Sequence, residues 1–222
     1  MKNTIQLNII RTGLIVITLL TALSAQAVVV NFPDAGLQAA VRSAIGKPTG
    51  DILDTDLVGT GFSSLSASQV SIADLTGLEY CTDLTYLNLH DNLISDISAV
   101  TGLTNLTDLR LDGNQISDVS AVAGLTNLTD LNIWNNQISD ISAVAGLTNL
   151  TALYLYENQI VDISAVAGLT KLTTLWLWGN QISDISVVAS LTNLRELTLN
   201  SNLISDISAV VGLTNLRYLY LD

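Results

Sequence analysis

The chain has 222 residues, of which 49% are hydrophobic and 13% are charged, and its formal net charge is −12. This hydrophobic content supplies a continuous core and excludes a largely disordered protein. A surface so rich in carboxylates repels phosphate backbones and anionic lipids, because binding to them depends on a cationic footprint. We therefore expect no nucleic-acid partner.

The first 27 residues have the organisation of a secretory signal peptide. Lys2 and Arg11 precede an apolar run over 12–24, and Ala-Gln-Ala at 25–27 forms an AxA cleavage site. Thr, Ser and Gln interrupt the run, which is shorter than the about 20 apolar residues of a membrane span. We expect cleavage after Ala27, no membrane insertion after it, and a secreted or cell-envelope protein. Loss of Lys2 and Arg11 moves the net charge from −12 to −14.

Residues 28–83 are predicted to form an N-terminal helical cap and degenerate first repeats. From Phe32 to Gly46, a Pro-Asp start, apolar residues at helical spacing and a final glycine predict one helix. The segment 51–83 keeps only an irregular apolar spacing, which suits a unit that covers the open end of a repeat array. Cys81 is the only cysteine. It cannot form an intrachain disulfide, and we expect a small buried apolar side chain.

From residue 84 to 222 the sequence repeats every 22 residues without insertion or deletion. Each row reads LxxLxLxxNxI and continues as ISDISAVxGLTN, giving six full repeats and a partial seventh. The rows begin at Leu84, Leu106, Leu128, Leu150, Leu172, Leu194 and Leu216. Stacked LxL segments predict a parallel sheet with strands about 4.8 Å apart. The expected fold is an α/β leucine-rich-repeat solenoid: a curved right-handed coil with a concave parallel β-sheet and short helical turns on the convex side.

Three polar or small columns accompany the leucines. We predict that the Asn92 column forms a buried ladder that satisfies backbone groups of the turns. The Asp96 column is predicted to cap the short helical turns, with a stripe of cation ligands as the alternative. Ser190 replaces a glycine in the Gly102 column, so a positive φ is not required there.

The segment LTNLTDLRLDGNQISDVSAVAGL and its copies resemble the 22-residue repeats of internalin-type bacterial leucine-rich-repeat proteins. The resemblance covers residues 72–222, although Ala or Val occupies positions where that family often has Pro, such as 99 and 121. It implies an exported or surface-attached protein that binds other proteins through its concave face.

Residues that alternate with the inward leucines should project from the concave face. All three Trp and five of the six Tyr fall in these columns. We expect an exposed aromatic patch with a polar rim, because Trp and Tyr dominate many interfaces. The candidate ligand-binding residues are Trp134, Tyr154, Tyr156, Trp176, Trp178, Arg110, Asp108, Asp130 and Asn132.

A protein ligand is the favoured partner, and a glycan or envelope polysaccharide is the alternative. A third interpretation is that the aromatic pairs only stabilise the sheet. Asp108 and Asp130 would lie on adjacent strands, and a carboxylate pair can hydrolyse glycosides. An open sheet offers no deep pocket, however, so we expect no enzymatic activity and no cofactor. His90 and Asp112 alone do not make a metal site.

The last residues, with Leu216, Leu219 and Leu221, begin a coil without a convex half. An uncovered last layer exposes apolar groups and a strand edge. We expect the chain either to be a fragment of a longer protein or to pair with another chain at this end.

Overall fold

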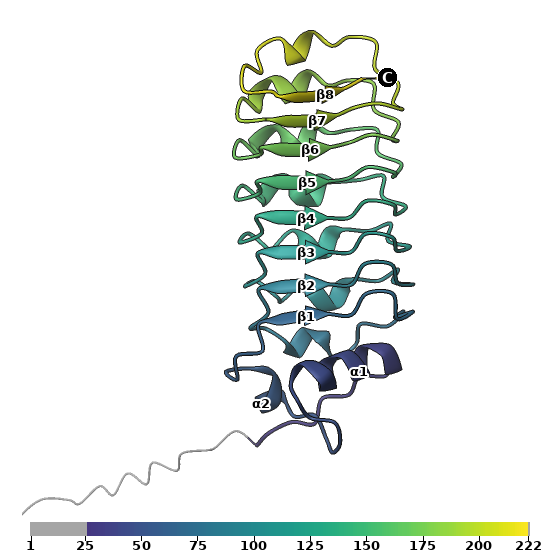
Figure 1. Cartoon of the computed structure of the whole chain (residues 1–222), viewed down its shortest axis with the longest axis vertical. Helices are drawn as coiled ribbons and strands as arrows, with labels where there is room; N and C mark the ends of the chain where they lie inside the picture. Colours follow the sequence, from purple (N-terminus) through teal and green to yellow (C-terminus); the bar gives the residue numbers. More distant parts are fainter. Residues whose placement is uncertain (1–25, 222) are drawn as a thin grey trace, which may run out of the picture.

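The computed structural model describes residues 26–221. The predicted signal peptide falls almost entirely on residues 1–25, outside the described residues. Within them, eight parallel strands form one sheet in sequential order (Figure 1). The strands are β1 (Ser64–Ser66), β2 (Tyr86–Asn88), β3 (Asp108–Arg110), β4 (Asp130–Asn132), β5 (Ala152–Tyr154), β6 (Thr174–Trp176), β7 (Glu196–Thr198) and β8 (Tyr218–Tyr220).

The sheet register follows the sequence period. Leu87 pairs with Leu109, Leu109 with Leu131, and each later pairing advances by the same 22-residue step. The degenerate segment also contributes a strand, because Leu65 of β1 pairs with Leu87 of β2. The sheet therefore begins one coil before the regular array.

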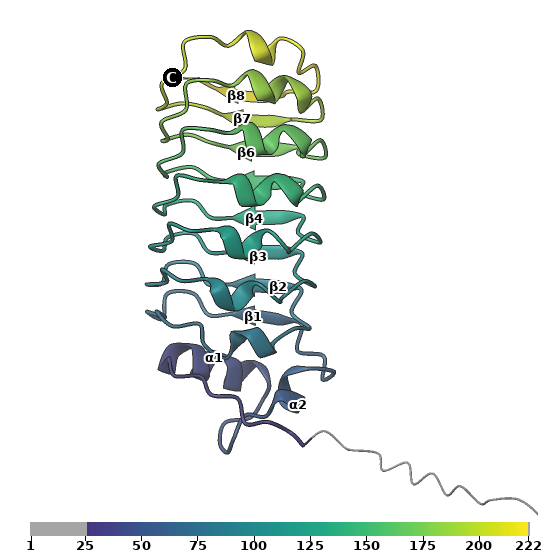
Figure 2. The ribbon, with the colours of Figure 1, turned by 180° about the vertical axis from the view of Figure 1, so that it is seen from behind.

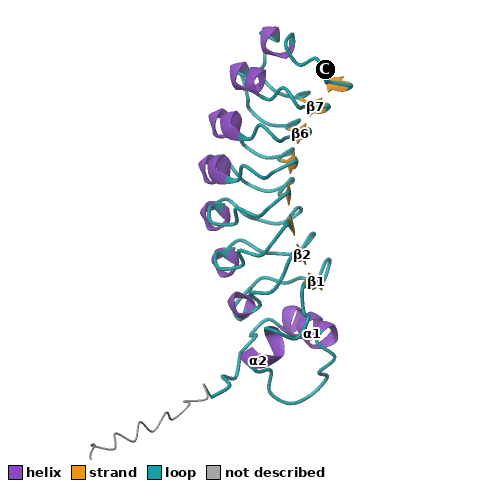
Figure 3. Ribbon diagram, turned by 90° about the vertical axis from the view of Figure 1, so that its left-hand side faces the viewer, coloured by secondary structure: helices purple, strands orange, loops and turns teal. Residues whose placement is uncertain are grey.

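Short 3₁₀ helices form the side opposite the sheet, as the back view shows (Figure 2). Seen from the side, the strands line the concave side of the solenoid and the helices its convex side (Figure 3). The solenoid prediction is confirmed. The helices are η1 (Leu78–Tyr80), η2 (Ser98–Val100), η3 (Ser120–Val122), η4 (Ser142–Gly146), η5 (Ser164–Gly168), η6 (Ser186–Ser190) and η7 (Ser208–Val210).

The core runs between the two sides as a continuous stack of aliphatic side chains. In the coil that contains β3, Leu106, Leu109, Leu111, Ile116 and Val122 have no exposed surface. Each coil contributes the same positions, so every layer packs against nearly identical layers above and below. The final coil is different, since Val211 is 83% and Leu219 36% exposed.

The Asn92 column forms the predicted ladder. Asn114 Nδ2 donates to the carbonyls of Leu111 at 2.9 Å and of Leu89 in the preceding coil at 3.1 Å. Its Oδ1 accepts from the backbone N–H of Ile94 at 3.0 Å. One buried amide therefore satisfies the turn of its own coil and joins it to the previous one. The same bonds recur at Asn136, Asn158, Asn180 and Asn202.

A second asparagine ladder was not predicted. Asn105 Nδ2 donates to the carbonyl of Thr82 at 2.9 Å, and Asn127 repeats this bond to Thr104. These bonds lie at the surface. At the same position in a later coil, Lys171 instead donates to Asn149 Oδ1 at 2.7 Å.

The aspartates of the Asp96 column bond the helical turns, but from one residue earlier than an N-cap. Asp96 Oδ1 accepts from the N–H of Ser98 at 2.8 Å, whereas Ile97 occupies the N-cap of η2. The serine N–H lowers the pKa of Asp118 and of Asp140, because it stabilises the charged carboxylate. The prediction that these aspartates are N-caps was therefore wrong by one position. The prediction that they bond the first turn of each short helix is confirmed.

Glycines of the Gly102 column do not have positive φ, in agreement with the serine at position 190. The left-handed conformation occurs at another column, immediately before the asparagine ladder. Its members are Asp91, Gly113, Asn135, Glu157, Gly179 and Ser201. A Cβ at Gly113 would meet Asp91 Oδ1 at 2.1 Å, so a larger residue there would require the Asp91 side chain to move.

The N-terminal cap consists of α1 (Ala35–Ala44) and α2 (Asp54–Leu57). Asp34 is the N-cap of α1 and accepts from the N–H of Leu37 at 3.0 Å, and Gly46 follows the helix with φ +66°. The predicted helix is confirmed. Asp34 also accepts from the N–H of Ala73 at 2.9 Å, which attaches the cap to the first coil.

Candidate ligand-binding surface

The aromatic residues form two contacting rows on the concave side of the sheet. Trp134, Tyr156 and Trp178 each lie two residues after a strand, at the same position of three successive coils. Tyr156 stacks on Trp134 with ring centroids 4.7 Å apart and planes at 11°, and on Trp178 at 4.8 Å and 15°. The two tryptophans come from opposite neighbours, so they cover both faces of the phenol ring. We call these three residues the aromatic stack.

The second row consists of Tyr154 on β5 and Trp176 on β6, which are direct partners in the sheet. Their rings meet edge to face at 5.0 Å, and Trp176 also lies 5.9 Å from Tyr156. All five aromatic side chains are half-buried. The expected patch is therefore present but less exposed than predicted, because the rings pack on one another.

Burial changes the acidity of both tyrosines. Loss of hydration, followed by the negative charges of Asp112 and Glu157, raises the pKa of Tyr156 to about 12. Burial is also the main reason why the pKa of Tyr154 is raised, and the charge of Asp130 adds to it. Both phenols are therefore neutral hydrogen-bonding groups over the physiological pH range.

Asp108 and Arg110 on β3 form the polar side of the surface next to the aromatic rows. Arg110 Nε and Nη2 donate to the two carboxylate oxygens of Asp108 at 3.2 and 3.3 Å. The guanidinium also lies 5.6 Å from the ring centroid of Tyr86, the residue beside Asp108 on β2. Arg110 is thus held between a carboxylate and an aromatic ring, with its cation directed away from β4.

Asp130 and Asn132 occupy the corresponding positions on β4, directly beside Asp108 and Arg110. Asp130 Oδ2 accepts from Thr129 Oγ1 at 2.9 Å. The Asn132 Oδ1 atom is buried and has no hydrogen-bond partner among the described residues. An unpaired buried acceptor of this kind costs about 1–3 kcal/mol.

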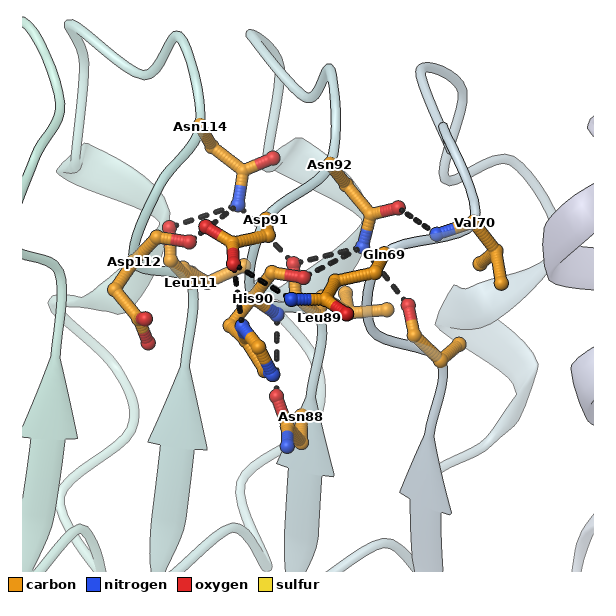
Figure 4. Close-up of polar contacts among 11 residues, drawn as sticks. Gln69, Val70, Asn88, Leu89, His90, Asp91, Asn92, Leu111, Asp112 and Asn114 are labelled. Carbon is orange, nitrogen blue, oxygen red and sulfur yellow. Dashed lines mark hydrogen bonds and ion pairs between the residues drawn. The ribbon is translucent and has the colours of Figure 1, made fainter.

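A second polar cluster lies at the edge of the sheet where β2 and β3 end (Figure 4). His90 Nδ1 lies 3.3 Å from Asp91 Oδ2, which also accepts from Gln69 Nε2 at 3.1 Å. Asp112, next to His90 in the following coil, is 5% exposed, and this burial raises its pKa. No group of three metal-ligating side chains occurs within residues 26–221.

The nine predicted site residues therefore lie on or just after four successive strands, β3 to β6. The five aromatic residues contact one another, as do Asp108 and Arg110. Tyr86 is the residue that the sequence interpretation did not single out. The sequence could have indicated Tyr86, because it occupies the repeat position of Asp108 in the preceding coil.

Two family models of leucine-rich repeats match most of the array, one over residues 104–147 and 148–190 and the other over 65–116 and 170–222. Among solved structures, an internalin C2 from Listeria monocytogenes is 38% identical with a TM-score of 0.70, covering 89% of this chain and 98% of that one. The chain belongs to the internalin-type leucine-rich-repeat family.

Other relatives are longer. An internalin F from Listeria monocytogenes is 35% identical with a TM-score of 0.83, and the match covers 89% of this chain but 59% of that one. A leucine-rich-repeat protein of Leptospira interrogans is 32% identical with a TM-score of 0.62, over 66% of this chain and 39% of that one. Among curated proteins, none matches the chain.

Leucine-rich-repeat proteins of this kind mediate protein–protein interactions in general and are typically not enzymes. The internalins among them are typically surface or secreted proteins. Within residues 26–221, no helix has the length and apolar character needed to cross a membrane.

Proposed function

We propose that this internalin-type protein is an exported, non-enzymatic scaffold that recognises a protein ligand through the concave face of its sheet. The observation that carries the proposal is the aromatic stack with its second row, five large rings gathered on three successive coils. The core of the solenoid is complete without them, since the leucines and isoleucines of these coils have almost no exposed surface. Clustered Trp and Tyr on such a surface are typical of interface hot spots.

The packing of the rings favours a protein over a glycan. A sugar ring binds by lying flat on an aromatic face, but both faces of Tyr156 are covered by Trp134 and Trp178. Tyr156 therefore presents only its ring edge and hydroxyl, which suit contacts with the varied side chains of a polypeptide. The acidic groups beside it, Asp108 and Asp130, supply the polar rim of such an interface.

The test is a binding screen with residues 28–222 against a library of secreted and cell-surface ectodomains, in parallel with a glycan array. We expect a polypeptide to bind and Trp178→Ala to weaken it at least tenfold. Val161→Ala is the control, because Val161 is an exposed apolar residue that precedes the convex helix η5. Binding to a glycan alone, or polypeptide binding that Trp178→Ala leaves unchanged, would contradict the proposal.

Export has its own test. In a bacterial secretion system, the processed protein is expected to begin at Val28, because Ala27 completes the AxA site. N-terminal sequencing of the exported protein checks this, and an unprocessed protein retained in the cytoplasm would contradict it.

A further inference from the structure

The sheet already contains one arginine held on its concave surface. Arg110 donates to both oxygens of Asp108 and lies 5.6 Å from the centre of the Tyr86 ring. A carboxylate, a ring on the adjacent strand and a planar guanidinium thus form one unit across β2 and β3.

The next strands also carry a carboxylate and a ring without the cation, although this ring lies in the column of Asn132 whereas Tyr86 lies in the column of Asp108. Asp130 is the sheet neighbour of Asp108, and Asn132 takes the position of Arg110. Tyr154 lies beside Asn132 on β5, so it provides a ring on an adjacent strand. Ala152, the sheet partner of Asp130, is too small to cover the carboxylate.

No cation in the described part of the chain neutralises the carboxylate at this place. Among residues 26–221 the ion pairs are Lys47–Asp56 and Arg110–Asp108, His90 lies beside Asp91, and none of these contacts includes Asp130. The Oδ1 atom of Asn132 is buried and has no hydrogen-bond donor among the described residues. The nearest cation, Arg110, is already engaged by Asp108.

We infer that Asp130, Asn132 and Tyr154 form a subsite for an arginine side chain of the protein ligand. The guanidinium donates to the Asp130 carboxylate, as Arg110 does to Asp108, and packs on the Tyr154 ring beside Asn132. Charge complementarity selects the occupant, because the surface offers carboxylates and an aromatic ring but no free cation at this position. A guanidinium fits better than an ammonium, since its planar fork reaches two acceptors at once. The inference rests on the proposed function and names the chemistry that the ligand presents to this part of the surface.

The experiment is an NMR titration of ¹⁵N-labelled protein with acetyl-Gly-Gly-Arg-Gly-Gly-amide. The probes are the Asn132 side-chain amide and the indole N–H of Trp176, whose ring meets that of Tyr154 at 5.0 Å. Peptides with Lys or Glu in place of Arg are compared at the same ionic strength. We expect saturable shifts with the Arg peptide, at least threefold weaker binding of the Lys peptide and no response to the Glu peptide.

Three variants locate the binding. Asp130→Asn is expected to weaken the Arg peptide at least tenfold. Asn132→Arg supplies an internal guanidinium two residues after Asp130, the spacing that Arg110 has from Asp108, and it should abolish peptide binding without lowering the melting temperature. Asp51→Asn removes the same charge at an exposed position in the N-terminal cap and should leave binding unchanged.

The inference is overturned if folded wild-type protein gives no saturable shift, if Arg and Lys peptides bind equally, or if Asp130→Asn or Asn132→Arg binds like wild type. The proposed function fails separately, through the Trp178→Ala screen, because Trp178 is outside the subsite. A ligand whose binding depends on Trp178, but which binds wild type and Asp130→Asn equally, would support the proposed function and contradict the subsite.

Discussion

Tyr156 lies between Trp134 and Trp178, with centroid distances of 4.7 and 4.8 Å and ring planes within 15° of parallel. The three rings therefore stabilise one another as well as forming a surface. Their contributions to folding are unequal, because the central ring has two stacked partners and each outer ring has one.

This inequality predicts that Tyr156→Ala destabilises the protein more than Trp178→Ala. Each stacked pair contributes about 0.5–1.5 kcal/mol beyond the burial of its area. Tyr156→Ala removes two stacked pairs and Trp178→Ala removes one, so we expect the loss of stacking to cost about 0.5–1.5 kcal/mol more in Tyr156→Ala. Urea unfolding of the two variants measures the difference. Equal midpoints would show that the rings fold independently.

We predict that the charged carboxylate of Asp112 destabilises the folded protein at neutral pH. Burial raises its pKa in the folded state, so the folded state favours the protonated form. Protonation of Asp112 stabilises the folded protein fully at pH values below the pKa of Asp112 in the unfolded state. This stabilisation is lost as the pH rises through the pKa of Asp112 in the folded state. Asp112→Asn should therefore raise the melting temperature at pH 7 and leave it unchanged in acid where both states are protonated.

Asp118 provides a control of opposite sign. The N–H of Ser120 lowers the pKa of Asp118 in the folded state. The charged Asp118 carboxylate therefore stabilises the folded protein at pH values above the pKa of Asp118 in the unfolded state, and this stabilisation is lost as the pH falls through its pKa in the folded state. Asp118→Asn is expected to lower the melting temperature at pH 7. Thermal unfolding of both variants between acid and neutral pH measures these effects. A change of melting temperature at pH 7 with the same sign in both variants would contradict the predicted roles of the two carboxylates.

The two asparagine ladders are expected to differ in strength. Asn114→Ala leaves the buried N–H of Ile94 without its acceptor, at a cost of about 1–3 kcal/mol, whereas the carbonyls of Leu89 and Leu111 keep the bonds from Asn92 and Asn136. Asn105→Ala removes one exposed bond whose carbonyl water can reach, and should cost less than about 1 kcal/mol. Chemical denaturation checks both, and comparable losses would contradict the ranking.

Cys81 is predicted to be inert in the folded protein. It is fully buried, and burial raises its pKa to about 12, so the nucleophilic thiolate is scarce at neutral pH. A disulfide reagent at pH 8 should leave the native thiol unmodified and react with it fully in denaturant. Rapid native labelling would mean that the junction of cap and array opens readily.

Much of this fold could be predicted from the spacing alone. A constant period places Leu109 beside Leu131 and Asp108 beside Asp130, because stacking identical coils leaves no freedom of register. The left-handed column was missed because Asp91, Glu157 and Ser201 share no residue type with Gly113. Neighbouring coils impose that conformation, and glycine is only one of the residues that tolerate it.

The details of the candidate surface depend on side-chain rotation, which the period does not determine. Arg110 has Asp108 on its own strand and Asp112 two residues later, and the choice of Asp108 with Tyr86 follows from local packing. The stacking of Tyr156 between two indoles and the unpaired oxygen of Asn132 likewise follow from torsion angles. The spacing predicted which residues share the concave face. The packing of their side chains decides which of them remain available to contact a ligand.

The bonds between coils join residues at constant separations along the chain: 20 and 25 for the buried asparagines, 23 for the exposed asparagines and 22 for the threonines. An in-frame duplication of one whole unit therefore gives every donor an acceptor of the same kind. Gain or loss of one whole unit can therefore lengthen or shorten the sheet by one strand while the bonds between coils stay the same. Mutation of the outward columns can then diversify each strand separately. The gene thus encodes a surface whose size and chemistry can evolve independently.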